Sequence, residues 1–266
     1  MTLPEITLRP SVSQSLVKEL RNNDACPRRV GGVYVMGMPT VPNEAQLRGI
    51  FFEYILTGSC GKSGIPPVEP VQRSGKRYVD FERLEQQAEF FRNELLPHYK
   101  IEVLDTDVVL ATEFEHPDTG EVITVKCRMD VLARVDGRLA VIDIKATGDV
   151  ANGGWRSPMN LDHTQAHFYT WALYQSQELN PEGVMPDFYY VVADWSPRMD
   201  YEVIKVEWSN SSFWDVRQAA TEAYEKLRKM EAEGFPTRPS YQQCQQCPFQ
   251  GSCPDRRLFK DVKVVW

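Results

Sequence analysis

Two aspartates and a lysine stand where two strand-like runs of the sequence meet. Asp130 lies in the first run, and Asp143 and Lys145 lie in the second, with the dipeptide Asp136-Gly137 between the runs. A D-G pair is a strong signal for a two-residue β-hairpin loop, because both turn positions need positive φ. Pairing the strands around this turn places Asp130 directly opposite Asp143.

Alternation along each strand divides the predicted hairpin into two faces. One face is wholly apolar and is expected to form the core; it carries Cys127, Met129, Val131, Ala133, Ala140, Ile142, Ile144 and Ala146. The other face carries both aspartates and Lys145. Two acids opposite each other repel unless a cation or a proton lies between them. The plain alternative is an amphipathic hairpin with a solvated polar face, on which Arg128 and Lys145 neutralise the acids.

The D-x-K triplet favours a chemical role over the plain alternative. Asp143 and Lys145 share a face, so a hard oxygen ligand and a cationic amine point at one place. Carboxylate oxygens hold Mg²⁺, and the ion lowers the pKa of a bound water. A lysine beside it can orient the attacking hydroxide or stabilise a charged phosphorane. These are the parts that phosphodiester hydrolysis needs.

Four of the six cysteines suggest a metal centre. Cys244, Cys247 and Cys253 form C-x-x-C-x-x-x-x-x-C, and Cys26 stands alone near the start, while Cys60 and Cys127 fit no pattern. Disulfides are a poor explanation in an intracellular chain. Zinc on four thiolates and a [4Fe–4S] cluster are both chemically possible. Proline follows three of the four cysteines, which is more typical of iron–sulfur sites.

Composition sets the broad class. The 266 residues include 42% hydrophobic and 25% charged residues, as in ordinary globular proteins. No run of about 18 apolar residues occurs, and the first ten residues lack the features of a secretory signal, so we expect a cytoplasmic protein without a membrane span. The net charge of −7 does not exclude DNA, because binding needs only a local basic strip. Basic residues flank the cysteines: Arg21, Arg28, Arg29, Arg238, Arg256, Arg257 and Lys260.

Hydrophobic periodicity predicts the elements that position these residues. Helices are expected at 11–22, 43–56, 80–96, 162–177 and 211–233. Strands are expected at 101–113, 121–135, 138–146, 187–193 and 201–207. Stretches rich in Gly, Pro or Ser at 58–77 and 148–160 read as loops. Helices on either side of a run of strands predict an α/β or α+β fold, with residues 1–266 in a single domain.

Taken in order, these features resemble the RecB-like branch of the PD-(D/E)XK nucleases over nearly the whole chain. The iron–sulfur members are the most similar, namely the AddB nuclease domain and the CRISPR-associated exonucleases of Cas-four type. The motifs that carry the resemblance are Gly49-x-x-x-Glu53, Asp130, Asp143-Ile144-Lys145, Gln165-x-x-x-Tyr169 and the four cysteines. The family more often has His where this chain has Glu53.

The resemblance implies a central mixed sheet flanked by helices, with metal-dependent deoxyribonuclease activity on single strands or DNA ends. Mg²⁺ or Mn²⁺ would be held by Glu53, Asp130, Asp143 and the backbone carbonyl of Ile144. Catalysis would rest on Lys145, Asp130, Asp143, Gln165 and Tyr169. A [4Fe–4S] cluster on Cys26, Cys244, Cys247 and Cys253 would clasp segments 11–30 and 236–260.

The resemblance also implies partners, and the sequence itself offers weaker candidate sites. Acting in DNA recombination, repair or processing, the protein would work with a helicase, an integrase or a recombination partner. The alternative is a non-catalytic iron–sulfur module that binds nucleic acid for such a partner. His163 and His167 lie one turn apart and could bind zinc. Glu113 or Glu115 could line the site, and Trp155 could stack on a base.

Overall fold

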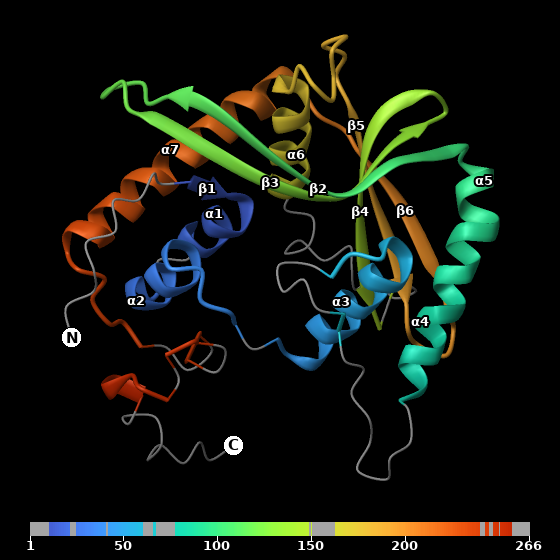
Figure 1. Cartoon of the computed structure of the whole chain (residues 1–266), viewed down its shortest axis with the longest axis horizontal. Coiled ribbons are helices and arrows are strands. Elements are labelled where there is room, and N and C mark those ends of the chain that lie inside the picture. The colour runs from blue at the N-terminus through green and yellow to red at the C-terminus, as the bar shows by residue number, and fades with distance from the viewer. Residues whose placement is uncertain are drawn as a thin grey trace. The chain divides into compact units, whose positions relative to one another are not determined.

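A computed structural model of the chain describes residues 11–21, 25–40, 42–60, 66–67, 78–148, 150, 163–239, 243–244, 247–249 and 251–256. The chain divides into two compact units (Figure 1). We call residues 1–43, 113–126 and 217–266 the terminal unit. Residues 44–112 and 127–216 are called the sheet unit. The two units are described separately below.

The terminal unit begins with a short strand, where the sequence predicted a helix from residue 11. Strand β1 (Ser11–Ser13) pairs in parallel with the start of β3 (Val122–Val135). Helix α1 (Gln14–Arg21) begins only after Ser13, whose Oγ accepts a hydrogen bond from the Leu16 amide at 3.3 Å. A side-chain cap of this kind marks the first turn of a helix. The helix therefore begins after Ser13, and Ser11–Ser13 form a strand.

Segments from both ends of the sequence lie together in the terminal unit. Helix α2 (Pro27–Val30) continues into a π-helical turn, η1 (Gly31–Val35). The Arg28 amide donates to the Pro236 carbonyl at 3.2 Å. The rings of Phe235 and Phe249 lie so close to Gly31 and Gly32 that a Cβ at either glycine would meet the ring at 2.8 or 2.5 Å. Glycine is needed at both positions because each aromatic ring occupies the space that a Cβ atom would fill.

The remaining part of the terminal unit is built on helix α7 (Asn210–Ala232), which confirms the predicted last helix. Lys226 Nζ donates to the Leu20 carbonyl at 3.1 Å, and Tyr224 OH donates to Glu121 at 2.7 Å. The last described element of the unit is a short 3₁₀ turn, η4 (Pro254–Arg256). Its core consists of apolar side chains that are at most 5% exposed: Val12, Leu16, Val17, Leu20, Val30, Ile123, Val125, Ala220, Ala223, Tyr224 and Leu227.

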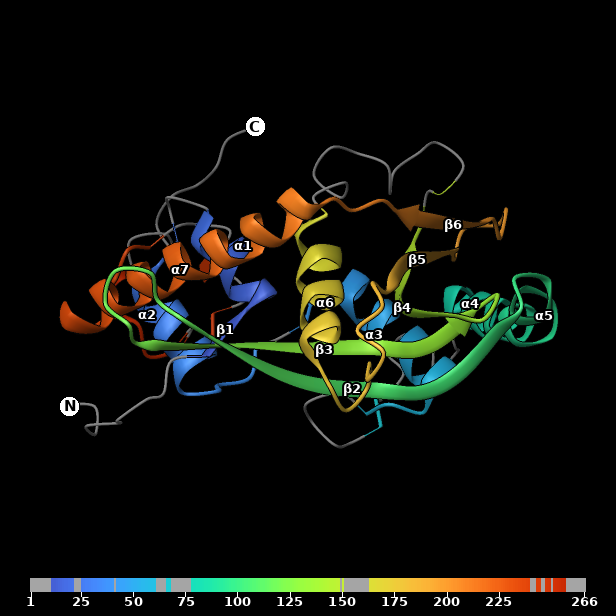
Figure 2. The same cartoon turned by 90° about the horizontal axis from the view of Figure 1, so that it is seen from above.

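The sheet unit contains a mixed sheet, as predicted, and its strands lie in the order β2-β3-β4-β5-β6. The strands other than β3 are β2 (Ile101–Glu115), β4 (Arg138–Thr147), β5 (Asp187–Asp194) and β6 (Tyr201–Val206). β3–β4 and β5–β6 are antiparallel, and β4–β5 is parallel. β2 runs beside β3 in both Figure 1 and Figure 2. A parallel pair needs a crossover, and helix α6 (Thr164–Gln175) supplies it between β4 and β5.

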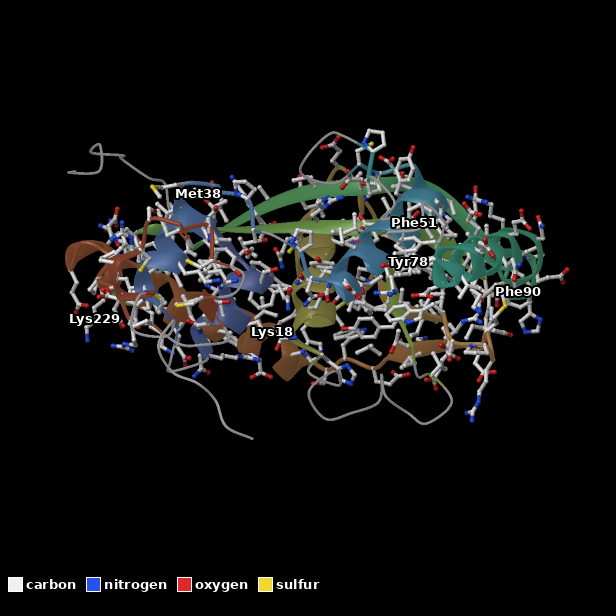
Figure 3. All side chains as sticks on the ribbon, turned by 90° about the horizontal axis from the view of Figure 1, so that it is seen from below. Lys18, Met38, Phe51, Tyr78, Phe90 and Lys229 are labelled. Carbon is white, nitrogen blue, oxygen red and sulfur yellow. The ribbon has the colours of Figure 1, made fainter. Side chains whose placement is uncertain are left out.

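Helices cover both faces of this sheet. One face packs against α3 (Glu44–Thr57) and α4 (Val79–Phe90), which continues through η3 (Phe91–Leu95) into α5 (Leu96–His98). Phe51 belongs to the hydrophobic core on this face, and the partly buried Tyr78 and Phe90 pack against that core (Figure 3). The opposite face packs against α6. No helix in the described ranges is long and apolar enough to span a bilayer.

Candidate functional site

The predicted hairpin forms with the predicted pairing. Asp136 and Gly137 both have positive φ, 48° and 82°, as a two-residue turn of this type requires. The ladder runs from Val135↔Arg138 to Val131↔Ile142 and ends there, one position before Asp130 would pair with Asp143. We call the region where the β3–β4 pairing ends, around Asp130 of β3 and Asp143 of β4, the fork. Beyond it, the Ile144 amide donates to the Asp130 carboxylate at 2.8 Å.

The apolar face of the hairpin is buried as predicted, but the face that carries the acids is not solvated. Leu132 is 4% exposed, and Val141 and Asp143 are both 0% exposed. Helix α6 covers this face, since the Tyr169 ring meets the ring of Phe188, the β5 partner of Val141. A solvated amphipathic hairpin is therefore the wrong interpretation. Asp143 is a carboxylate in the core of the sheet unit.

Asp143 and three other predicted site residues form one chain of contacts. The Lys145 ammonium forms an ion pair with Asp143 Oδ2, and Gln165 Nε2 donates to Oδ1. The same Gln165 nitrogen lies 3.2 Å from the Tyr169 hydroxyl, as their spacing of one helical turn predicts. Among the described residues, no well-aligned hydrogen bond reaches Oδ2. The Lys145 ammonium is thus the one charged group held against this oxygen among the described residues, and it meets the oxygen without ideal hydrogen-bond geometry.

Glu53 reaches the same region from α3, but its direct partner is Arg128. Arg128 Nη2 lies 3.1 Å from Glu53 Oε1, and its Nε pairs with Asp107. Ser59 Oγ accepts from Arg128 Nη2 at 2.8 Å and donates to Asp107 at 2.9 Å. The sequence interpretation gave Arg128 only a neutralising role and missed Asp107 and Ser59. No spacing signal joins these positions, because they lie on three different elements.

Burial and like charge perturb the acids of the site. Burial, with Asp130 nearby, raises the pKa of Glu53 to about 7, although Arg128 opposes the shift. Burial likewise raises the pKa of Asp143 to about 7, with Lys145 opposing and Asp130 adding to the rise. Burial also raises the pKa of Asp130. Burial alone would lower the pKa of Lys145, but Asp143 and Asp130 raise it above its ordinary value.

These side chains fit a hard divalent cation in chemistry and charge. In the described part of the chain, no three His, Cys, Asp or Glu side chains stand close enough to ligate an ion as they are placed. The carboxylates are instead held by Lys145 and Arg128. Three neighbouring carboxylates whose pKa values are raised are nevertheless the set of hard oxygen ligands that Mg²⁺ or Mn²⁺ prefers.

The four predicted cluster cysteines line one cavity in the terminal unit. Its other lining residues are Arg28, Arg29, Thr237, Pro239, Gln243 and Phe249. The Arg238 amide donates to Cys26 Sγ at 3.3 Å, and the Cys26 amide donates to Gln243 Oε1 at 2.9 Å. None of the six cysteines, all of which the structure describes, forms a disulfide. Cys127 lies elsewhere, with its thiol donating to the Phe168 carbonyl at 3.5 Å.

The remaining candidates are placed as follows. The rings of His163 and His167 are 6.3 Å apart. Glu113 is exposed, and its carboxylate accepts from the Thr124 hydroxyl at 3.2 Å. Trp155 and most of the 148–160 loop lie outside the described residues.

The sequence profile of the PD-(D/E)XK nuclease superfamily matches residues 67–254. The chain belongs to this superfamily. The matched range contains Asp130, Asp143, Lys145, Gln165 and Tyr169 and leaves out Glu53 and Cys26.

One solved structure shares the fold of this chain. A protein from Eubacterium rectale, provisionally described as an exonuclease, has a TM-score of 0.61 at 15% identity, over 100% of this chain and 96% of that one. LHK-Exo, crystallised with dAMP, gives 0.37 at 13% identity over 84% and 92%, too low to support an argument. A search of curated proteins gives no match.

The raised pKa values predict how stability depends on pH when no divalent ion is added. Between the ordinary carboxyl pKa of about 4 and the raised value near 7, the folded protein holds protons that the unfolded chain has released. Stability should therefore fall as pH rises through this window. Asp143→Asn should weaken that fall and make the protein roughly 1–3 kcal/mol more stable than wild type at pH 8.

Chemical denaturation in EDTA at pH 5, 6, 7 and 8 measures this effect. Asp105→Asn removes one charge from an exposed position on β2 and is the matched control, which should leave the pH dependence unchanged. A wild-type stability that rises steadily from pH 5 to 8 would contradict the prediction.

Proposed function

We propose that this nuclease is a Mg²⁺- or Mn²⁺-dependent deoxyribonuclease whose active site is the fork of the sheet unit. One observation carries the proposal: Asp143 is fully buried, yet it pairs with Lys145 and lies within electrostatic reach of Asp130. A buried cluster of like charges is costly to keep for stability alone. Perturbed carboxylates of this kind are typical of catalytic sites.

Each residue is assigned a task that its contacts support. Asp130, Asp143, Glu53 and the Ile144 carbonyl would hold the ion, which supplies Lewis-acid stabilisation of the phosphate when bound. The Lys145 ammonium, about a quarter exposed, can turn from Asp143 toward the attacking water or the scissile phosphate. Gln165 holds Asp143 in place and keeps the Tyr169 hydroxyl close to its own amide group.

The proposed substrate is single-stranded DNA or a DNA end, processed exonucleolytically in recombination, repair or DNA processing. The E. rectale protein, with the same fold, is provisionally described as an exonuclease. A helicase, an integrase or another recombination protein would present such ends to the site.

We further propose a [4Fe–4S] cluster on Cys26, Cys244, Cys247 and Cys253. The four thiols line one cavity, and an amide donates to the sulfur of Cys26, as is common around iron–sulfur clusters. No three cysteines among the described residues are gathered tightly enough for a single ion.

Asp143→Asn and Lys145→Ala should each lower Mg²⁺-dependent cleavage by at least about 100-fold, because each removes a group placed at the reacting phosphate. Lys145→Ala should still bind Mn²⁺, since the amine does not ligate the ion. Lys205→Ala removes a cation from the β6 edge, where it pairs with Asp187, and serves as the control. Near-normal activity of Asp143→Asn would refute the assignment of this site.

Substrate preference is measured with end-labelled single strands, linear duplex and covalently closed duplex. Single strands and linear ends should be degraded, while the closed duplex should persist. Added salt should inhibit strongly through lost phosphate contacts. Rapid cutting of the closed duplex would contradict an end-dependent mode.

Anaerobically purified protein should be brown, with iron and sulfide in about equal amounts. Replacing any of the four cavity cysteines by Ser should bleach it, and Cys60→Ser and Cys127→Ser are the matched controls that should keep the colour. Colourless protein with stoichiometric zinc would refute the cluster.

A further inference from the structure

Glu53 differs from the other proposed ligands because it comes from a helix and not from the sheet. The Thr57 hydroxyl donates to the Glu53 carbonyl at 2.8 Å, one turn further along α3. The Ser59 amide donates to Thr57 Oγ1, and the Thr106 hydroxyl of β2 donates to the Thr57 carbonyl at 3.4 Å. These contacts tie the end of α3 to β2. They fix the backbone of Glu53 but not its carboxylate.

The carboxylate is fixed by Arg128, which is itself held on two sides. Arg128 meets Glu53 Oε1 through Nη2, while its Nε pairs with Asp107 and Nη2 also reaches Ser59 Oγ. Ser59 Oγ donates in turn to the second oxygen of Asp107 at 2.9 Å. Asp107 therefore neutralises much of the Arg128 charge, so Glu53 is not the only carboxylate that pairs with the guanidinium. All three charged side chains are between a quarter and a third exposed.

Asp107 adopts a backbone conformation that a strand does not call for. Its φ is 58°, in the left-handed region, within the fifteen-residue strand β2. A non-glycine residue in this region is disfavoured and persists where its surroundings hold it. The next residue, Val108, is buried in the core. Both carboxylate oxygens of Asp107 are held in this conformation, Oδ1 by Arg128 and Oδ2 by Ser59.

We propose that Asp107, Ser59 and Arg128 form a positioning network for Glu53, here called the Asp107 network. The network holds Oε1 of Glu53, so that the remaining oxygen is presented to the divalent ion, and Asp107 keeps Arg128 from competing with that ion. Groups that hydrogen-bond to a ligating carboxylate commonly change metal affinity in this way. The inference rests on the proposed metal-dependent function.

The alternative role for the same residues is a structural ion pair that joins α3, β2 and β3. Such a pair would change stability when broken but would not act on metal affinity through Glu53. Asp107→Asn distinguishes the two roles, because Asn tolerates the left-handed conformation and is similar in size, yet leaves the charge of Arg128 unbalanced. An unbalanced guanidinium should hold Glu53 more tightly and exclude the ion.

The test is a Mn²⁺ titration of the full chain, with free Mn²⁺ followed by its EPR signal. Asp107→Asn should weaken Mn²⁺ binding by about 10- to 100-fold, and Ser59→Ala should weaken it less. Asp105→Asn removes the same charge two residues away at an exposed position and should change the Kd less than about twofold. Equal effects of Asp105→Asn and Asp107→Asn would overturn the network.

A double-mutant cycle with Glu53→Gln tests whether the effect passes through Glu53. In that background Asp107→Asn should have no further effect on the Kd. The same fold-loss in both backgrounds would contradict the inference. Circular dichroism verifies folding of each variant. If Asp107→Asn unfolds, Asp107→Gly is used in its place, because glycine adopts a positive φ without strain.

Failure of the network and failure of the proposed function give different results. If wild type binds Mn²⁺ and Asp143→Asn abolishes binding while Asp107→Asn does not alter it, only the network is wrong. If wild type binds no Mn²⁺, the metal-dependent function and the network both fall.

Discussion

Carboxylates crowd around one lysine ammonium in the interior of the sheet unit, and the energy of that crowding constrains everything placed near it. Asp143 has no exposed surface, and Asp130 and Glu53 both act on it electrostatically. Bringing such charges out of water costs several kcal/mol per ion unless partners compensate. Lys145 and Arg128 provide part of that compensation. The raised pKa values show that it is incomplete.

The end of the β3–β4 ladder is what makes this arrangement possible. If pairing had continued past Val131↔Ile142, the two aspartates would have faced each other across a closed ladder. Since it stops, the Ile144 amide is served by the Asp130 side chain instead of by a strand partner. A buried amide is thus satisfied, and a carboxylate is held in place by the same bond. The parallel β4–β5 connection then brings Gln165 of α6 onto Asp143.

Local rules predicted most of the fold and much of the site. The Asp136-Gly137 turn determined the pairing of β3 with β4, and helical spacing brought Gln165 and Tyr169 together. Rules of alternation could not tell that α6 would bury the acidic face, although Leu132 and Val141 on that face were a signal. Neither the start of α1, which depends on the Ser13 cap, nor the Asp107–Arg128 contact follows from periodicity. The Asp107–Arg128 contact joins distant positions, and the left-handed backbone conformation of Asp107 could not be predicted from the sequence.

In the cysteine cavity of the terminal unit, as at the carboxylates of the sheet unit, burial and neighbouring acidic groups make ionisation unfavourable. Burial raises the pKa of Cys247, and Cys26 and Cys244 raise it further, although the Phe249 amide opposes them. Thiols gathered in this way stay protonated until a metal displaces the protons. The hydrogen bonds between Cys26 and Gln243 and between Arg28 and Pro236 already hold the two ends of the sequence together. A metal centre there would therefore add stability to segments already in contact, and its loading would release protons and become easier as pH rises.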